Sequence, residues 1–359
     1  LRLRSDVRVG ACLSGGLDSS SIVAIASREY KNKEPFMLFH IHTSADDEYS
    51  ELKYVKELIK DLNVELIKIN VDNNLIKDSI EDTILTQEEP FGSPSVILQY
   101  ILMKTANKYN CKVLLDGQGG DETLLGYERY FPSAIISAPF YKIPMILKNI
   151  VYKSRLSLKN IIYYILYFTS KNIRLWYLLN RNNFLLPSLR NKINKKLIKE
   201  SAKNYRNIKD LQRQELFSTQ LPHLLRYEDK NSMKFSIETR LPFLDYNLVD
   251  YSVALPLKYK IRNGWTKYIL RKSMNKLMPK NITWRKNKMG FELPERDLIA
   301  SIGKSFRSDI LDSKLLYQLC DMNKVKTSFD NLNKRTLWRM YNIAKWEKLF
   351  NVNKCTFNE

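Results

Sequence analysis

The sequence has few cysteines and no long apolar segment. Its four cysteines, Cys12, Cys111, Cys320 and Cys355, are far apart, and no pair has the spacing of a metal-ligand or redox motif. We therefore expect free thiols in a reducing compartment, the cytoplasm, and we find no secretory signal. The longest apolar run, residues 161–168, is too short to span a bilayer. These absences disfavour a disulfide-stabilised secreted protein and a membrane-spanning protein.

Acidic residues are scarce relative to basic ones. The chain has 59 Lys and Arg against 38 Asp and Glu, a net charge of +21, and residues 141–213 carry 17 basic and 2 acidic residues, or +15. Such a segment is typical either of a solvated helical surface or of a surface that binds nucleic acid or anionic lipid. The segment contains no recognisable nucleic-acid-binding motif. We favour the solvated surface and expect neither nucleic acid nor a membrane as a partner.

The order of the apolar patterns predicts an α/β fold with a doubly wound parallel sheet. Between residues 7 and 130, β-prone segments alternate with segments whose apolar residues have helical spacing. The β-prone segments are residues 7–12, 36–42, 64–71 and 112–115. Repeated strand–helix units produce a parallel sheet with helices on both faces.

The chain divides into four parts, without internal repeats or low-complexity linkers. Residues 1–135 form the α/β domain, and residues 136–215 form a basic helical insertion. Residues 216–295 are helical and contain further motifs. Residues 296–359 form a mainly helical C-terminal extension that is polar and has few motifs.

The first motif is a glycine- and serine-rich loop between a predicted strand and a predicted helix, residues 13–20. Gly15 and Gly16 allow a ligand to approach the backbone, and the helix start offers unpaired N–H groups, which together suit a phosphate. The loop also supplies the hydroxyl groups of Ser14, Ser19 and Ser20. Asp18 would repel a phosphate unless a cation such as Mg²⁺ lies between them. The alternative is a turn in which Asp and Ser cap the helix.

The second motif, residues 116–127, again combines glycines with acidic residues after a predicted strand. In parallel sheets, ligands bind at the carboxyl ends of the strands, so both loops are expected to line one crevice. Asp121 is then the second carboxylate for the cation at Asp18. The alternative is an acidic surface turn.

Two further segments, residues 221–245 and 264–271, interleave charged and apolar residues. This pattern indicates partly buried polar groups, which need partners. A lysine such as Lys267 beside a pyrophosphate leaving group would neutralise developing charge. By itself, Lys267 is most simply a solvated cation.

The four segments together resemble the synthetase domain of the glutamine-hydrolysing asparagine synthetase family. The first loop resembles the Ser-Gly-Gly-x-Asp-Ser pyrophosphate loop (PP-loop) of the N-type ATP pyrophosphatases, and Gly-Lys-Ser/Thr of the kinase P-loop is missing. The other family motifs are Gly-x-Gly-x-Asp-Glu, Arg-Tyr-Glu-Asp-x-x-Ser-Met, Glu-x-Arg-x-Pro-Phe-Leu-Asp and Thr-Lys-x-x-Leu-Arg. The resemblance extends to about residue 294 and is weak beyond it. It implies the adenine nucleotide alpha hydrolase-like fold.

The resemblance implies an ATP and magnesium site in residues 1–135. ATP and its pyrophosphate would contact Leu13, Ser14, Gly15, Gly16, Asp18, Ser19, Ser20, Ile41, Asp116 and Gly117. Magnesium would bind Asp18 and Asp121. Lys267 resembles the family lysine that stabilises the charged states, so the implied catalytic residues are Lys267, Asp18, Asp121 and Gln118. The implied acceptor-site residues are Gln118, Glu122, Glu238, Arg240 and Asp245, although Glu238, Arg240 and Asp245 equally suit a structural role.

The reaction implied by the resemblance is the formation of an acyl-adenylate and then of an amide. A small-molecule carboxylate, most simply aspartate, would attack the α-phosphate of ATP, and ammonia would then expel AMP. Gln118 stands where the best-known members have Glu, and Gln cannot take a proton. Either the base lies elsewhere or the acceptor is another carboxylate, such as a sugar acid or a peptide.

The glutaminase of the family is absent from this sequence. Cys12 follows a predicted strand and cannot replace its N-terminal catalytic cysteine. Residues 1–6 resemble the end of a helix and no initiating Met is present, so we expect a glutaminase domain or subunit upstream. The alternative function is a catalytically silent nucleotide-binding or nucleic-acid adaptor module. A homodimer is the open alternative for the oligomeric state.

Overall fold

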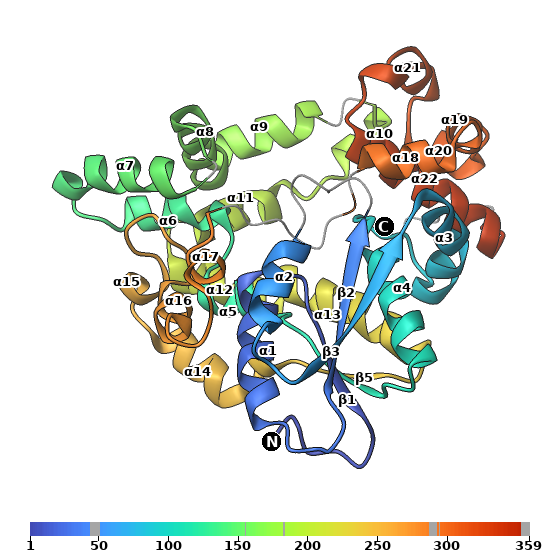
Figure 1. Cartoon of the computed structure of the whole chain (residues 1–359). Coiled ribbons are helices and arrows are strands. Elements are labelled where there is room, and N and C mark those ends of the chain that lie inside the picture. Colours follow the sequence, from blue (N-terminus) through green and yellow to red (C-terminus); the bar gives the residue numbers. More distant parts are fainter. Residues whose placement is uncertain (44–50, 155, 182–183, 287–292, 294, 353–359) are drawn as a thin grey trace.

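A five-stranded parallel sheet forms the centre of the molecule (Figure 1). The computed structural model describes residues 1–43, 51–154, 156–181, 184–286, 293 and 295–352. The strands have the order β3-β2-β1-β4-β5, and every neighbouring pair is parallel. They are β1 Val9–Cys12, β2 Phe36–Thr43, β3 Val64–Val71, β4 Val113–Leu115 and β5 Glu238–Arg240. The predicted α/β fold with a parallel sheet is confirmed.

Alternation along the strands creates one core on each face of the sheet. Met37 and Phe39 of β2 pack into one core with α3 (Asn73–Gln87) and α4 (Ser95–Lys108). Their neighbours Phe36 and Leu38 pack into the other core with α1 (Leu17–Glu29) and α2 (Leu52–Ile59). The sheet is therefore covered on both faces, which is the doubly wound arrangement.

Strand β5 corrects one expectation. We expected residues 216–295 to be helical, but Glu238–Arg240 pairs with β4 at the sheet edge and a 3₁₀ turn follows at Pro242–Leu244. The reason is long-range pairing: the amide of Glu238 donates to the carbonyl of Lys112 (2.9 Å). Three polar or charged side chains give no apolar alternation from which a strand could be predicted.

The basic segment folds into short helices that share a small core with the end of the second motif. Leu125, Tyr130, Ile150, Ile161 and Leu211 are buried together in this core. Figure 1 shows α7, α8 and α9 along the upper border, away from the lower ends of the strands. The helices from the second loop onward are α5 Gly120–Leu124, α6 Phe131–Ile136, α7 Ile143–Lys153, α8 Leu158–Thr169, α9 Lys171–Arg181, α10 Pro187–Asn191, α11 Lys195–Asn204 and α12 Ile208–Phe217.

The remaining helices complete the two cores of the sheet. Trp338 and Tyr341 of the last helix pack into the same core as β2 and α3. The helices are α13 Gln220–Met233, α14 Tyr246–Ala254, α15 Leu257–Lys260, α16 Tyr268–Met274, α17 Lys280–Thr283, α18 Glu295–Ile302, α19 Ser305–Leu311, α20 Lys314–Leu319, α21 Met322–Thr327 and α22 Lys334–Phe350. The predicted helical C-terminal part is present as far as it is described; residues 353–359 lie outside the described residues.

Two expectations from composition can be compared with the described residues. Cys12, Cys111 and Cys320 are free thiols, and Cys355 lies outside the described part. None of the described helices is long and apolar enough to cross a membrane.

Candidate active site

The first motif forms a loop held by its own polar groups between β1 and α1. Gly15 has a positive φ of 75°, and a Cβ atom there would lie 3.2 Å from the carbonyl oxygen of Glu51. The Ser14 amide donates to the Ser19 hydroxyl (3.2 Å), and the Gly16 amide donates to the Ser14 hydroxyl (3.2 Å). Gly16 is the N-cap of α1 and supplies no side-chain cap. The arrangement leaves the helix start available to an anion.

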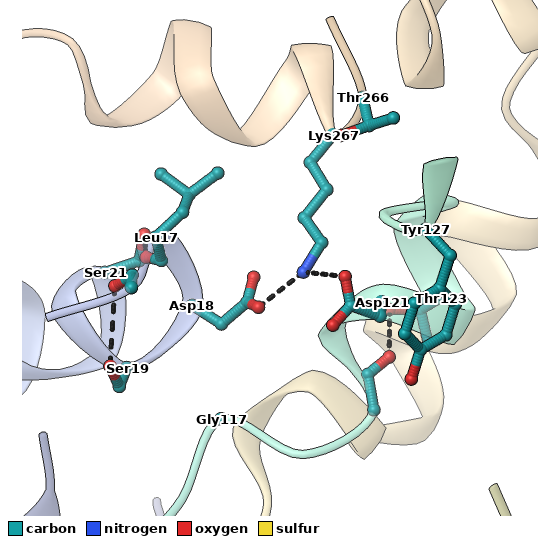
Figure 2. A network of polar contacts seen from close by, with 12 residues as sticks. Leu17, Asp18, Ser19, Ser21, Gly117, Asp121, Thr123, Tyr127, Thr266 and Lys267 are labelled. Carbon is teal, nitrogen blue, oxygen red and sulfur yellow. Dashed lines mark hydrogen bonds and ion pairs between the residues drawn. The ribbon is translucent and has the colours of Figure 1, made fainter. Parts of the chain in front are cut away.

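Asp18, Asp121 and Lys267 meet in one ion-pair cluster (Figure 2). Asp18 comes from the first turn of α1, Asp121 from α5, and Lys267 from the N-cap of α16. The Lys267 ammonium contacts a carboxylate oxygen of Asp18, and it lies 2.7 Å from Oδ1 of Asp121. Lys267 is only 3% exposed. The two acidic residues therefore lie together, as expected for loops at the carboxyl ends of parallel strands, and Lys267 is not a solvated cation.

Glycines make this close approach possible. A Cβ atom on Gly126 would collide with both Oδ1 of Asp121 and Cε of Lys267. A Cβ atom on Gly120 would lie 3.0 Å from Oδ1 of Asp18. Any side chain at position 126 would therefore separate the carboxylate from the ammonium.

The two carboxylates suit a cation that is shared with a phosphate chain. Mg²⁺ in nucleotide sites is typically bound by one or two carboxylates, and phosphate oxygens and water complete its coordination. Oδ1 of Asp18 is buried and has no hydrogen-bond partner among the described residues, so it can accept such a ligand. No group of three or more His, Cys, Asp and Glu side chains in the described part of the chain could hold a metal alone. Asp18 and Asp121 are enough for a Mg²⁺ ion that phosphate oxygens and water also coordinate.

Leu13 and Ile41 lie at neighbouring strand ends. The Leu13 amide donates to the carbonyl of Phe39 (2.9 Å), and its own carbonyl is 2.8 Å from Nδ1 of His40. Burial lowers the pKa of His40, so the neutral ring can donate its Nδ1 proton to Leu13. Ile41 is half-buried, and Ser20 is fully buried in α1. The position of Leu13 is thus fixed by β2.

The start of the second motif contains one member of an acidic pair, half-buried Asp116, whose neighbour is Glu228. Asp116 accepts the Gly117 amide (2.5 Å), and burial raises the pKa of Asp116 to about 6. Glu228 of α13 is buried, and burial followed by the Asp116 charge raises the pKa of Glu228 well above its usual value. A Cβ atom on Gly117 would lie 3.1 Å from Cβ of Asp18, which brings this loop against the first one. Gln118 is half-buried next to it.

A match to a family model decides the family. The model described as asparagine synthase matches residues 1–348 of the chain. The chain belongs to the asparagine synthase family. The match confirms the resemblance and extends it beyond residue 294, where we expected it to weaken.

Similar proteins include asparagine synthetases of this family. The chain is 28% identical to "Asparagine synthetase [glutamine-hydrolyzing] 1" of Bacillus subtilis (strain 168), over 82% of this chain and 48% of that protein. It is 26% identical to synthetase 3 of the same organism, over 79% of this chain and 45% of that protein. "Amidase chry2" of Gibberella zeae is 24% identical over 76% of this chain and 47% of its own length. The chain spans about half the length of the curated relatives it matches.

Three of the predicted acceptor-site residues of this asparagine synthase family member lie together at the sheet edge. Nε of Arg240 lies 2.8 Å from the Glu238 carboxylate, and Nη1 donates to the carbonyls of Arg2 (2.9 Å) and Arg4 (2.8 Å). Asp245 accepts from Arg2 (3.4 Å). These contacts attach the N-terminal segment to β5. None of the contacts described for these three residues involves the Lys267 cluster, and their assignment to the acceptor site stays a prediction.

Glu122, the other predicted acceptor-site residue, is directed into a buried polar network. It is 1% exposed, and its carboxylate accepts the Tyr127 hydroxyl (2.6 Å). Gln212 of α12 donates to the backbone carbonyls of Glu122 (3.0 Å) and Thr123 (2.5 Å). Lys260 in turn donates to Oε1 of Gln212 (2.7 Å). Sequence motifs did not identify Gln212 or Lys260, because neither belongs to a recognisable pattern.

Arg285 is a further residue that the sequence analysis missed. Its Nη1 atom lies 3.2 Å from the Glu51 carboxylate and 3.5 Å from the carbonyl of Gly15, and its guanidinium lies 4.1 Å from the Tyr54 ring centre. The side chain is 9% exposed. Arg285 therefore places a buried cation beside the phosphate-type loop. Nothing distinguishes it from the other basic residues in the sequence.

Proposed function

We propose that the protein is an ATP-dependent carbon–nitrogen ligase that forms an acyl-adenylate and then an amide, with aspartate as the simplest acceptor. The observation that carries the proposal is the meeting of Asp18, Asp121 and Lys267 between two glycine-rich loops. Family membership and the similarity to glutamine-hydrolysing asparagine synthetases support the reaction type.

The first loop would hold the pyrophosphate end of ATP. Ser14, Gly15, Gly16 and Ser19 would contact the phosphate oxygens. Leu13, Ile41 and Asp116–Gly117 would border the adenosine. Asp18 and Asp121 would hold magnesium, which would neutralise charge on the pyrophosphate when bound. We assign this binding to residues 1–135 and the acceptor side to residues 216–295.

Two bond exchanges make up the proposed reaction. A carboxylate oxygen of the acceptor forms a bond to the α-phosphorus, and the bond between that phosphorus and the bridging oxygen to the β-phosphate breaks. Lys267 lies where it can offset the charge that the departing pyrophosphate gains. Ammonia nitrogen then bonds to the acyl carbon, AMP leaves with its oxygen, and the nitrogen loses a proton. Gln118 cannot accept this proton because its amide is neutral.

The nitrogen source and the acceptor belong to the finer part of the proposal. Ammonia would come from a glutaminase domain or subunit outside this sequence, as the names of the relatives suggest for those proteins. The alternative acceptors are a sugar acid or a peptide. Gln118 supports an acceptor other than aspartate. The similarity to a protein named as an amidase also supports this alternative. The intact cluster of Asp18, Asp121 and Lys267 disfavours a catalytically silent nucleotide-binding or nucleic-acid adaptor module.

A pyrophosphate-release assay tests the proposal. The purified chain is given ATP, Mg²⁺, ammonium and either aspartate, sugar acids or short peptides, and AMP and pyrophosphate are measured. We expect equal amounts of both with one acceptor. Lys267→Ala should lower the rate by roughly a hundredfold, because a charge-stabilising group is lost. Lys272→Ala, an exposed lysine of the same helix, is the matched control and should leave the rate unchanged.

Three results would contradict the proposal. They are release of ADP and phosphate instead of AMP and pyrophosphate, absence of pyrophosphate with every acceptor, and equal rates for the two lysine variants. Circular dichroism of both variants shows whether they keep the fold.

A further inference from the structure

We propose that the surface formed by residues 140–142 and helices α7, α8 and α9, here called the basic helical face, binds to the surface of an anionic membrane. The sequence favoured a solvated surface for this segment. The apolar side chains that the fold exposes favour an interaction surface instead. The inference does not depend on the ligase reaction, because none of these residues lies in the Asp18–Asp121–Lys267 cluster.

The charge of this region has one sign. Residues 129–199 contain 14 Lys and Arg residues and no Asp or Glu. Lys142, Lys148, Lys159, Lys171 and Arg181 are all exposed. Since no carboxylate of the segment offsets them, their combined field attracts an anionic surface.

Residues 140–141 and the helices that follow them also expose large apolar side chains. Phe140 is 84% exposed, Tyr141 67%, Met145 56%, and Tyr152 and Trp176 both 65%. Exposed apolar groups that cluster on a few neighbouring elements mark an interaction surface, whereas single ones do not. The aromatic members are of the kind that sits at a membrane–water interface.

Helix α8 shows the arrangement most clearly. Leu158, Ile162 and Leu166 are exposed and are spaced four residues apart, so they lie along one side of the helix. Ile161 is buried in the local core. The helix therefore buries one apolar side and presents a second one to solvent, which its own fold leaves uncovered.

Aliphatic groups among cations favour a membrane surface over nucleic acid. An interfacial helix inserts Leu, Ile and aromatic side chains at the boundary of headgroups and acyl chains, while Lys and Arg pair with the anionic headgroups. A nucleic-acid surface uses cations with stacking aromatic rings and gains little from exposed Leu and Ile. No described helix could span the bilayer, so the contact is peripheral.

Vesicle co-sedimentation of the full chain tests the proposal. We expect binding to vesicles of phosphatidylcholine with about 30% phosphatidylserine, and at least about tenfold weaker binding to pure phosphatidylcholine. Adding salt to about 0.5 M should weaken binding to the anionic vesicles by a similar factor. Equal binding to both vesicle types, or no binding to either, would overturn the proposal.

Matched variants locate the surface. Lys148→Glu/Lys159→Glu should weaken anionic-vesicle binding by about tenfold. Lys326→Glu/Lys334→Glu changes the net charge equally at exposed positions on α21 and α22, and should change binding by less than about twofold. Equal losses in the two variants would show attraction by net charge alone and overturn the assignment.

An apolar variant and a second ligand separate the remaining possibilities. Met145→Gln/Trp176→Gln keeps all charges and should also weaken vesicle binding, since the aliphatic and aromatic groups insert at the interface. Mixed-sequence RNA is titrated under the same conditions. The membrane proposal would be overturned if the protein bound RNA more tightly than anionic vesicles and if Met145→Gln/Trp176→Gln left RNA binding unchanged. That result would favour a nucleic-acid surface.

Discussion

Lys267 links two carboxylates that would otherwise repel each other. Asp18 and Asp121 approach the same ammonium from different helices, and like charges at this separation are unfavourable without a cation between them. Gly126 supplies the space for this contact. The cluster has one more negative than positive charge, so it retains a capacity for a further cation.

Asp116, which lies beside the buried Glu228, predicts a specific dependence of stability on pH. Burial raises the pKa of Asp116 from 3.8 to about 6. The folded state therefore holds a proton that the unfolded state releases between these values, and the free energy of unfolding falls as pH rises from about 4 through 6. Two pKa units correspond to about 3 kcal/mol.

Asp116→Asn removes this titration. In urea unfolding measured at several pH values, the free energy of unfolding should fall between about pH 4 and pH 7. This fall should be up to about 3 kcal/mol larger for the wild type than for the variant. Asp78→Asn, at an exposed position of α3, is the control and should follow the wild type. If Asp116→Asn also follows the wild type across this range, the pKa of Asp116 is not raised in the fold.

Among single residues, those that belong to sequence motifs could be predicted. Those that reach the site only through contacts made in the fold could not. Asp18, Asp121 and Lys267 stand in motifs, and the rule for parallel strands placed the first two together. Arg285 reaches Gly15 only because the fold returns the chain there after 270 residues. No local pattern encodes that approach.

Helix α5, which carries Asp121, has five residues and depends on its neighbours for its position. Gln212 of α12 binds two of its backbone carbonyls, and Lys260 orients Gln212. Leu244 lies against Gly119, immediately before the helix. The basic segment thus contributes a helix that fixes a predicted site residue.

A double-variant cycle tests this connection. Gln212→Leu removes two hydrogen bonds to backbone carbonyls and leaves the buried Lys260 without its side-chain acceptor. The free energy of unfolding should therefore fall by about 3 kcal/mol. Lys260→Met should also destabilise, because the Gln212 amide oxygen then lacks a donor. In urea unfolding, Gln212→Leu/Lys260→Met should lose less than the sum of the two single variants, since both polar partners are replaced together. Additive losses would show that the two side chains do not interact.

Elements with strong periodicity were predictable, and short ones were not. The predictions for residues 36–42 and 64–71 match β2 and β3 within a residue. Strand β5 was missed because its three residues carry no apolar pattern and its partner β4 lies more than a hundred residues earlier. The short helix α5 was likewise read only as a loop.

The parallel sheet organises the whole molecule. All five strands run in the same direction, so the loops after β1 and β4 open at one edge, and the chain returns through α16 to place Lys267 between them. The basic helical face lies on other elements. Nucleotide chemistry and surface attachment are therefore proposed for separate regions of one chain.

The most direct test of the central claim is calorimetric titration with ATP in the presence and absence of Mg²⁺. For the wild type, Mg²⁺ should strengthen ATP binding by at least about tenfold, because Asp18 and Asp121 would hold the cation against the pyrophosphate. In Asp18→Asn/Asp121→Asn this gain should disappear, whereas the exposed control Asp78→Asn/Asp312→Asn should keep it. An equal gain from Mg²⁺ in the wild type and in Asp18→Asn/Asp121→Asn would contradict the account.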